Sequence, residues 1–132
     1  MGLFDKVFKS ERDIAKEEVK KVPWNELTTI EQLDDIEKES ADHAVAILKH
    51  STRCGISRMV LKQFETDYKE EYKDVKLYFL DLLNHREISD EIASRFEVRH
   101  ESPQLIILRD GRVAHHASHQ DIHAETLANH LK

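Results

Sequence analysis

The feature that most constrains the fold of this chain is a pair of short, uninterrupted apolar runs. The first is Ala44–Leu48 and the second is Leu105–Leu108. Apolar runs of this length without polar alternation are typical of strands that are buried on both faces of a sheet. Such strands need a covering layer on each side, so we expect an α/β fold in which helices enclose a central sheet.

The segments around the first run predict two helices and a further strand. Residues 29–32 (Thr-Ile-Glu-Gln) have the form of a capping box, and the apolar stripe that follows predicts a helix ending near Ser40. A loop, His50 to Arg53, leads to Cys54, which opens the next helix. In that helix apolar and aromatic residues recur at helical spacing, at Val60, Leu61, Phe64, Tyr68 and Tyr72. Residues 75–83 then predict the next strand because they are rich in β-branched and aromatic side chains.

The last third predicts a helix, a hairpin and a closing helix. Ser89 is the expected N-cap of the first helix, and Asp110-Gly111 is a hairpin turn that joins residues 105–108 to a strand at 113–117. Asp121 is the expected N-cap of the closing helix. With a short strand near Trp24, the order is βαβαβα followed by ββα. This is the thioredoxin-like topology, a three-layer α/β fold around a central mixed sheet.

The length of 132 residues suits one domain, which we expect over residues 22–132, preceded by a flexible or weakly helical extension over residues 1–21. The net charge of −6 argues against a nucleic-acid binder. No stretch is long and apolar enough to span a bilayer, and the first residues lack the apolar core of a signal peptide. We therefore expect a cytoplasmic protein with no membrane partner.

Cys54 is the only cysteine, so the chain cannot form an internal disulfide. It follows a buried strand and opens a helix, where free backbone N–H groups and the helix dipole stabilise a thiolate. We therefore expect the pKa of this thiol to lie below its free value. Lys49, Arg53 and Arg58 could add positive potential, and Gly55 leaves room for an approaching thiol. The alternative is a buried, inert cysteine, which fits poorly between Arg53 and Gly55.

Cys54 and Ser57 form a C-x-x-S arrangement. In C-x-x-C proteins the second cysteine resolves the mixed disulfide, which a serine cannot do. The Ser57 hydroxyl can donate a hydrogen bond to a thiolate or orient a partner, or it can bond its own backbone in the first helical turn. In either case Cys54 would form a mixed disulfide that an external thiol must resolve. We take Cys54 and Ser57 as the candidate catalytic pair.

A third element, Ser102-Pro103, stands immediately before the second apolar run. Proline is tolerated at the start of a strand, and X-Pro bonds supply nearly all cis peptides. A cis bond here would present the Ser102 backbone to an extended partner. An ordinary trans proline that ends the preceding loop is the alternative.

These residues together resemble the bacillithiol-system, thioredoxin-like YtxJ family, also called monothiol bacilliredoxins. The resemblance covers about residues 22–132 and rests on the topology, on residues 52–57 (Thr-Arg-Cys-Gly-Ile-Ser) preceded by Lys-His-Ser, and on Ser-Pro-Gln at 102–104. It implies that Cys54 takes up bacillithiol from S-thiolated client proteins and that a second bacillithiol regenerates the enzyme. Members often have Pro after the cysteine, where Gly55 stands here. The candidate substrate-binding residues are Thr52, Arg53, Gly55, Ile56, Ser102 and Pro103.

Two alternatives remain open at this point. Cys-Gly-Ile-Ser is similar to the Cys-Gly-Phe-Ser signature of monothiol glutaredoxins, which use glutathione and can carry an iron–sulfur cluster between two subunits. We expect no permanently bound cofactor, only bacillithiol or glutathione as co-substrate. A non-catalytic, stress-associated binding module would instead use the Ser102-Pro103 edge for docking.

Nine histidines invite a metal hypothesis. His115 and His116 are neighbours on a predicted strand, so they face opposite sides and cannot share a metal without distortion. His119 and His123 would align only on a helix that began before Asp121. We therefore predict no metal site. His50, four residues before Cys54, could raise the local potential or pair with the thiol.

Overall fold

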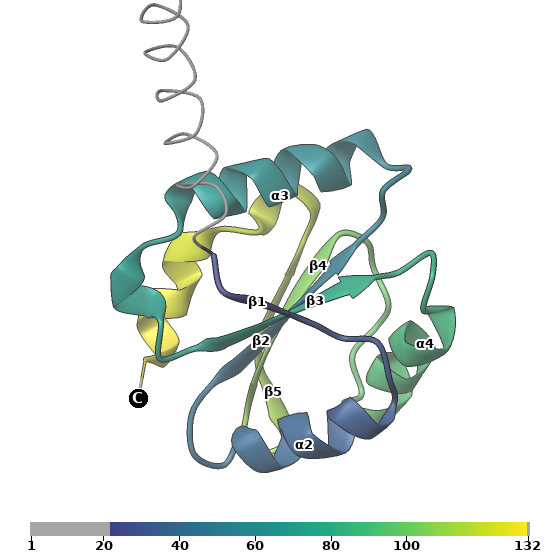
Figure 1. Cartoon of the computed structure of the whole chain (residues 1–132), viewed down its shortest axis with the longest axis vertical. Coiled ribbons are helices and arrows are strands. Elements are labelled where there is room, and N and C mark those ends of the chain that lie inside the picture. The colour runs from purple at the N-terminus through teal and green to yellow at the C-terminus, as the bar shows by residue number, and fades with distance from the viewer. Residues whose placement is uncertain (1–21, 132) are drawn as a thin grey trace, which may run out of the picture.

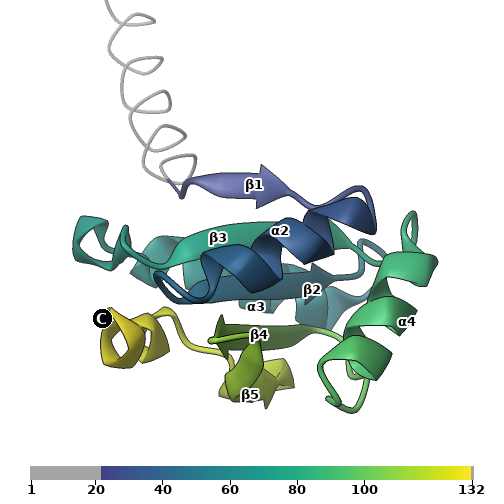
Figure 2. The ribbon, with the colours of Figure 1, turned by 90° about the horizontal axis from the view of Figure 1, so that it is seen from below.

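The computed structural model describes residues 22–131, so the expected extension over residues 1–21 lies outside the described residues. A five-stranded sheet forms its centre, in the order β1-β3-β2-β4-β5 (Figure 2). The strands are β1 (Trp24–Glu26), β2 (Val45–His50), β3 (Lys76–Asp81), β4 (Gln104–Arg109) and β5 (Arg112–Ser118). β1 and β2 run parallel to β3, whereas β4 is antiparallel to both β2 and β5. The predicted mixed sheet is confirmed.

Helices cover both faces of this sheet and make three layers (Figure 1). The α-helices α2 (Glu31–Glu39) and α4 (Arg86–Arg95) lie on one face. The α-helix α3 (Gly55–Asp67) and the C-terminal 3₁₀-helix η3 (Ala124–His130) lie on the other. Two short 3₁₀-helices, η1 (Glu70–Tyr72) and η2 (His119–Asp121), complete the described chain. The order of elements is the one expected from the sequence.

The two apolar runs form the middle of the core. All six residues of β2 are buried, and its side chains alternate between the faces of the sheet. Ala46 and Leu48 pack in one cluster with residues of α3 and η3. Val45 and Ile47 pack in the other cluster, with residues of α2 and α4. The prediction that these strands are buried on both faces is confirmed.

The predicted capping box at the start of α2 is present. The Thr29 Oγ1 atom accepts a hydrogen bond from the Gln32 backbone N–H at 3.3 Å. In return, the Gln32 Oε1 atom accepts one from the Thr29 backbone N–H at 2.9 Å. The helix ends at Glu39, next to the predicted end at Ser40. Both hydrogen bonds are local, which is why the sequence pattern alone identified them.

The predicted continuation of α3 to Tyr72 is wrong. The helix ends at Asp67, and Tyr68 is extended with ψ 137°. Tyr72 belongs to the separate helix η1, and its ring lies edge-on to that of Tyr68, with the centroids 5.8 Å apart. Tyr68 and Tyr72 both pack against the α3-side core, so their apolar spacing comes from shared burial and not from one continuous helix.

Two predicted helix caps and the length of one strand also need correction. α4 starts at Arg86 with His85 as its N-cap, so Ser89 lies inside the helix. The closing helix starts at Ala124 with His123 as its N-cap, is a 3₁₀-helix, and leaves Asp121 in η2. The strand predicted over residues 75–83 covers only Lys76–Asp81. Neither His85 nor His123 makes a side-chain capping hydrogen bond, so side-chain capping preferences, on which the predictions rested, do not set these helix starts.

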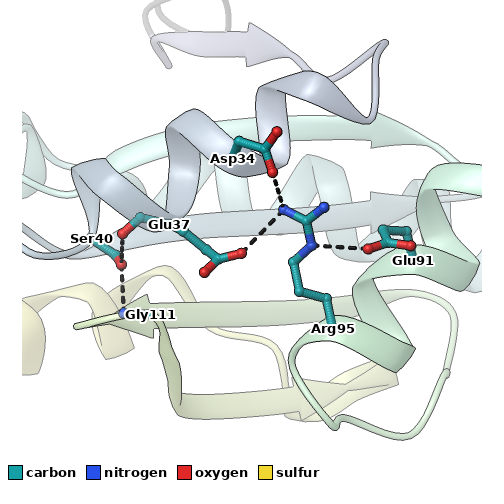
Figure 3. A network of polar contacts seen from close by, with 6 residues as sticks. All are labelled: Asp34, Glu37, Ser40, Glu91, Arg95 and Gly111. Carbon is teal, nitrogen blue, oxygen red and sulfur yellow. Dashed lines mark hydrogen bonds and ion pairs between the residues drawn. The ribbon is translucent and has the colours of Figure 1, made fainter.

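The hairpin between β4 and β5 is docked at the end of the sheet where β2 begins (Figure 3). Asp110 and Gly111 have φ of 55° and 74°, the left-handed values that a two-residue type I′ turn requires at both positions. The Gly111 N–H donates to the Ser40 Oγ atom at 2.8 Å. Beside it, Arg95 of α4 binds carboxylates of α2 and so joins the two helices.

Candidate active site

Cys54 lies where the sequence predicted, between the central strand and α3. β2 ends at His50, one residue into the predicted loop, and Cys54 is the N-cap of α3 with φ −101° and ψ 121°. Its carbonyl accepts the first helical hydrogen bond, from the Arg58 N–H at 3.2 Å. The side chain is partly exposed, and the thiol is free. The thiol is therefore open to a reaction partner at the end of the helix where backbone N–H groups are unpaired.

The surroundings of Cys54 lower the pKa of its thiol below the ordinary value. The largest cause is a hydrogen bond from the Ser57 backbone N–H, and the Ser57 hydroxyl, the Ile56 N–H and the nearby charge of Arg58 act in the same direction. Desolvation opposes them without reversing the direction. The lowered pKa agrees with the expectation from the sequence that a helix N-terminus stabilises the Cys54 thiolate.

The loop before Cys54 is held by side chains of α3. The Arg58 guanidinium donates to the Thr52 carbonyl at 3.1 Å, and the buried Ser57 Oγ atom accepts from the Ser51 N–H at 3.3 Å. The Ser57 oxygen thus bonds backbone while its own proton remains available to the thiolate. Both roles considered for Ser57 from the sequence are compatible with this geometry.

Lys49 does not face the thiol, contrary to the sequence-based suggestion. Its side chain is fully buried on the α4 side of the sheet, with Nζ 2.7 Å from His100 Nδ1. The Ser89 Oγ atom lies 3.2 Å from the same Nδ1. Burial lowers the pKa of Lys49 to about 8, and burial together with the Lys49 charge lowers the pKa of His100. A neutral His100 imidazole that accepts at Nδ1 fits both contacts.

His50 is a buried neighbour of the site and adds no charge to it. Its side chain is packed against Phe79, with ring centroids 5.3 Å apart, and its Nδ1 atom has no hydrogen-bond partner among residues 22–131. Burial lowers the pKa of His50, which favours the neutral ring. The groups that shift the thiol are those of α3, so the suggested pairing of His50 with Cys54 finds no support.

The first turn of α3 gives the thiol an open, apolar border. Ile56 and Met59 are exposed, although both are large apolar residues. At Gly55 an added Cβ would meet only the Arg58 Nη2 atom, at 4.0 Å. Space beside the sulfur is therefore present, but Gly55 is not required to create it.

Ser102 and Pro103 lie at the same end of the sheet as Cys54. The Ser102-Pro103 peptide bond is cis, so the trans alternative is wrong. The residue that follows, Gln104, opens β4 opposite Lys49 of β2. The Ser102 Oγ atom is buried without a partner among the described residues. The topology thus brings all the candidate site residues to one end of the sheet.

The turn between β3 and α4 also reaches this region, which the sequence did not reveal. Thr52 and Arg53 line an open cavity of about 360 Å³ together with Leu83, Asn84 and Arg86. A neighbouring cavity of about 250 Å³ shares Leu83 and Arg86 and continues to Ser89, Asp90 and His100. No local motif marks Asn84 or Arg86, because their proximity to Arg53 depends on β3 pairing with β2.

The histidines near the C-terminus are arranged as the strand pattern predicted. His115 is partly buried, with its ring centroid 6.0 Å from that of His130, whereas the adjacent His116 is exposed. Within residues 22–131, His, Cys, Asp and Glu side chains form no group of three or more that could hold a metal ion. In the same range, no helix has the length and apolar character needed to cross a membrane.

The chain is similar to a known protein family over most of its length. The family model described as monothiol bacilliredoxin BrxC matches residues 25–127. The chain belongs to the monothiol bacilliredoxin family. The resemblance stated from the loop around Cys54 is thereby confirmed, and so is a thiol redox function at the level of the family.

Solved structures support the same fold. A candidate oxidoreductase with a thioredoxin fold is 33% identical, with a TM-score of 0.69 over 81% of this chain and 92% of that chain. The thioredoxin of Malassezia sympodialis is 18% identical, with a TM-score of 0.64 over 81% of this chain and 90% of its own. Fasciola hepatica thioredoxin is 19% identical, with a TM-score of 0.62 over 80% and 98%. The bacilliredoxin domain thus has the thioredoxin fold predicted from its order of elements.

Proposed function

We propose that this protein removes a low-molecular-weight thiol, preferably bacillithiol, from mixed disulfides on client proteins. The observation that carries the proposal is a partly exposed thiol of lowered pKa at the N-cap of α3, with a serine one turn later. A thiolate at this place is a nucleophile toward disulfides. We place the reaction in the cytoplasm, where reduced thiols are abundant.

The reaction has two balanced steps. The Cys54 thiolate attacks the sulfur of the small thiol in the mixed disulfide, and the client leaves as a thiolate that takes up a proton. A second molecule of the small thiol, as its thiolate, then attacks the same sulfur. Its attack releases the symmetric disulfide and regenerates the Cys54 thiolate. The protein ends unchanged. One free small thiol is oxidised for each client thiol that is released, and it pairs with the small thiol that the mixed disulfide already held.

Ser57 and Arg58 serve the first step by stabilising negative charge on Cys54. Since Ser57 carries no second thiol, it cannot resolve the adduct from within the chain. The adduct should therefore persist until an external thiol arrives. This persistence is what distinguishes the proposed monothiol cycle from a thioredoxin cycle.

The deciding experiment measures release of the small thiol from a bacillithiolated or glutathionylated protein. Cys54→Ser should lower the rate at least about a thousandfold, because a hydroxyl is not ionised at neutral pH. Ser94→Ala, a change of an exposed residue on α4, is the control for handling and folding. Full activity of Cys54→Ser would refute the proposal.

Intact-mass analysis separates bacillithiol from glutathione. Reduced protein is exposed to each oxidised thiol in turn, and the proposal expects a Cys54 adduct with bacillithiol at the higher rate. The glutaredoxin-like alternative rests on the similarity of Cys-Gly-Ile-Ser to Cys-Gly-Phe-Ser. It predicts faster reaction with glutathione and a brown dimer after anaerobic purification with glutathione. A colourless monomer would count against it.

A further inference from the structure

The cavity lined by Thr52 and Arg53, the two residues before Cys54, has a positively charged lining in an acidic protein. The chain as a whole has a net charge of −6, yet two arginines, Arg53 and Arg86, line the cavity and no acidic residue does. Among residues 22–131 neither forms an ion pair with a carboxylate. The remaining lining residues, Thr52, Leu83 and Asn84, are uncharged. An anion placed here would meet two positive charges that no described carboxylate neutralises.

A carboxylate contacts one of the lining residues from outside the cavity. Asp81 accepts a hydrogen bond from Asn84 Nδ2 at 2.7 Å and does not line the cavity. That contact directs the Asn84 amide and leaves its second N–H available. Arg53 directly precedes Cys54 in the chain, so the cavity borders the loop that leads to the thiol, although Cys54 itself does not line it.

Two other cavities among the described residues lack this uncompensated positive charge. The adjoining cavity contains Asp90, which opposes an anion. At the other end of the sheet, a cavity of about 460 Å³ also has two arginines, Arg95 and Arg112. Its lining includes Glu97, and Arg95 is already bound to carboxylates, so it offers no comparable anion site.

We propose that the cavity lined by Thr52, Arg53, Asn84 and Arg86 recognises the carboxylates of the small thiol whose sulfur is exchanged at Cys54. The inference rests on the proposed function and specifies its substrate class as thiols that bear carboxylates. Guanidinium groups bind carboxylates through paired N–H donors, and a volume of about 360 Å³ lies within the range of small-ligand pockets. The carboxylates stay ionised throughout, and only the sulfur atoms exchange bonds.

Both bacillithiol and glutathione present carboxylates, so charge alone does not choose between them. The site instead separates them from neutral and cationic thiols. Because the arginines are exposed, each contact should contribute modestly, and its effect should shrink as salt is added. Recognition of the carboxylates should therefore raise the rate at low substrate concentration and leave the rate at saturation unchanged.

The test compares disulfides that differ in charge. Reduced protein reacts with oxidised bacillithiol, glutathione disulfide, neutral bis(2-hydroxyethyl) disulfide and cationic cystamine, and the second-order rate constants are measured. The wild type should favour the anionic disulfides over the neutral one. In the double variant Arg53→Gln/Arg86→Gln the ratio of anionic to neutral rates should fall about tenfold, and the cystamine rate relative to the neutral rate should rise.

Two controls isolate the cavity. Arg112→Gln removes one positive charge at the distant cavity and should leave the rate ratio unchanged. Arg86→Lys keeps the charge and should retain most of the preference. The thiol pKa of every variant is titrated, because Arg53 adjoins Cys54. The inference is overturned if the double variant keeps the wild-type ratio, or if Arg112→Gln lowers the ratio as much as the double variant does.

A binding experiment keeps this inference distinguishable from the exchange function. S-methylglutathione, which cannot exchange, is titrated into Cys54→Ser protein and followed by amide NMR shifts. Shifts at Thr52, Arg53, Asn84 and Arg86 that disappear in the double variant support the site even if exchange fails. Exchange at Cys54 without such shifts and without charge preference would leave the function standing and overturn the site.

Discussion

The two ends of the sheet contain similar polar side chains but satisfy them differently. Where β2 begins, Arg95 contacts Asp34, Glu37 and Glu91 at 2.8, 3.1 and 3.0 Å (Figure 3). Where β2 ends, the buried Lys49 has no carboxylate partner among residues 22–131, and its Nζ atom contacts the His100 imidazole instead. At the first end, opposite charges are paired. At the second end, burial lowers the pKa values of Lys49 and His100.

Unpartnered polar atoms do not follow this division and occur at both ends of the sheet. His50 Nδ1, Asp81 Oδ1 and Ser102 Oγ lie at the Cys54 end, buried and without hydrogen bonds among the described residues. At the other end, the Tyr68 hydroxyl and Arg109 Nη1 are likewise buried without hydrogen bonds among the described residues. Glu39 Oε2 also lacks a hydrogen bond there, although it forms an ion pair with Lys76 Nζ at 2.9 Å. Buried polar groups without partners cost stability, so they are expected where function requires them. The two ends therefore differ in their charged groups, which are paired around Arg95 and shifted in pKa around Lys49, and not in the number of unpartnered atoms.

The largest effect that tests this comparison is the pH dependence caused by Lys49. Its pKa falls from 10.5 to about 8 on folding, a difference of about 2.5, which corresponds to about 3 kcal/mol. The pKa of Lys49 is lower in the folded protein, so at pH values between about 8 and 10.5 the Lys49 amine is more fully protonated in the unfolded chain. The free energy of unfolding should therefore rise as pH increases from 8 toward 10.5, and this contribution is lost as pH falls through 8.

Lys49→Met should remove this rise, and it should stabilise the protein at pH 7 because no amine then needs to be buried. Urea unfolding of both proteins across this pH range provides the measurement. The raised pKa values of Tyr68 and Tyr78 act on both proteins alike, so the difference between the two profiles isolates Lys49. A difference that does not change with pH would contradict the assignment.

The next effect concerns the other end of the sheet. Arg95→Met should lower the free energy of unfolding by about 1–2 kcal/mol, a modest value because the partner carboxylates are partly exposed. The loss should shrink at high salt, and the thiol pKa of Cys54 should not change. Arg112→Met is the matched control, since Arg112 makes no ion pair among residues 22–131. A change in thiol pKa would show that the two ends are coupled.

A smaller effect is expected from Ser57→Ala. The variant loses the hydroxyl that lowers the pKa of Cys54 but keeps the backbone N–H, so the thiol pKa should rise and still stay below its ordinary value. At a pH below that pKa, alkylation of Cys54 should slow as the thiolate fraction falls. The unpaired Ser51 N–H should cost about 1 kcal/mol of stability. Thiolate absorbance and urea unfolding measure the two effects, with Ser94→Ala as the control.

The smallest effect is predicted for Gly55→Pro. Gly55 is the first residue of α3, where proline is favoured, and the extended Cys54 before it already has the conformation that precedes proline. The free energy of unfolding should increase by about 0.5–1 kcal/mol, because proline restricts the unfolded chain. Thermal and urea unfolding provide the check. A loss of stability would mean that the first turn is less open than the contacts at Gly55 indicate.

Much of the site was predictable because it depends on neighbours in the chain. The strand Ala44–Leu48, the turn and the helix start follow one another within a few residues, and they alone place Cys54 at an N-cap. The capping box at Thr29 and Gln32 is equally local. The arrangement of Lys49 with His100 was not predictable, since an exposed lysine and a buried one have the same sequence pattern.

The sequence by itself determined the order of elements, the two buried strands and the solitary thiol at a helix start. These features depend on apolar periodicity and on backbone geometry over one or two turns. Only the tertiary structure decided that Lys49 faces away from Cys54, that Tyr72 leaves the helix, and that Arg86 comes to stand beside Arg53. Each of these outcomes depends on how strands pair and which face a helix covers. Contacts of that kind join residues far apart in the chain, and no local pattern specifies them.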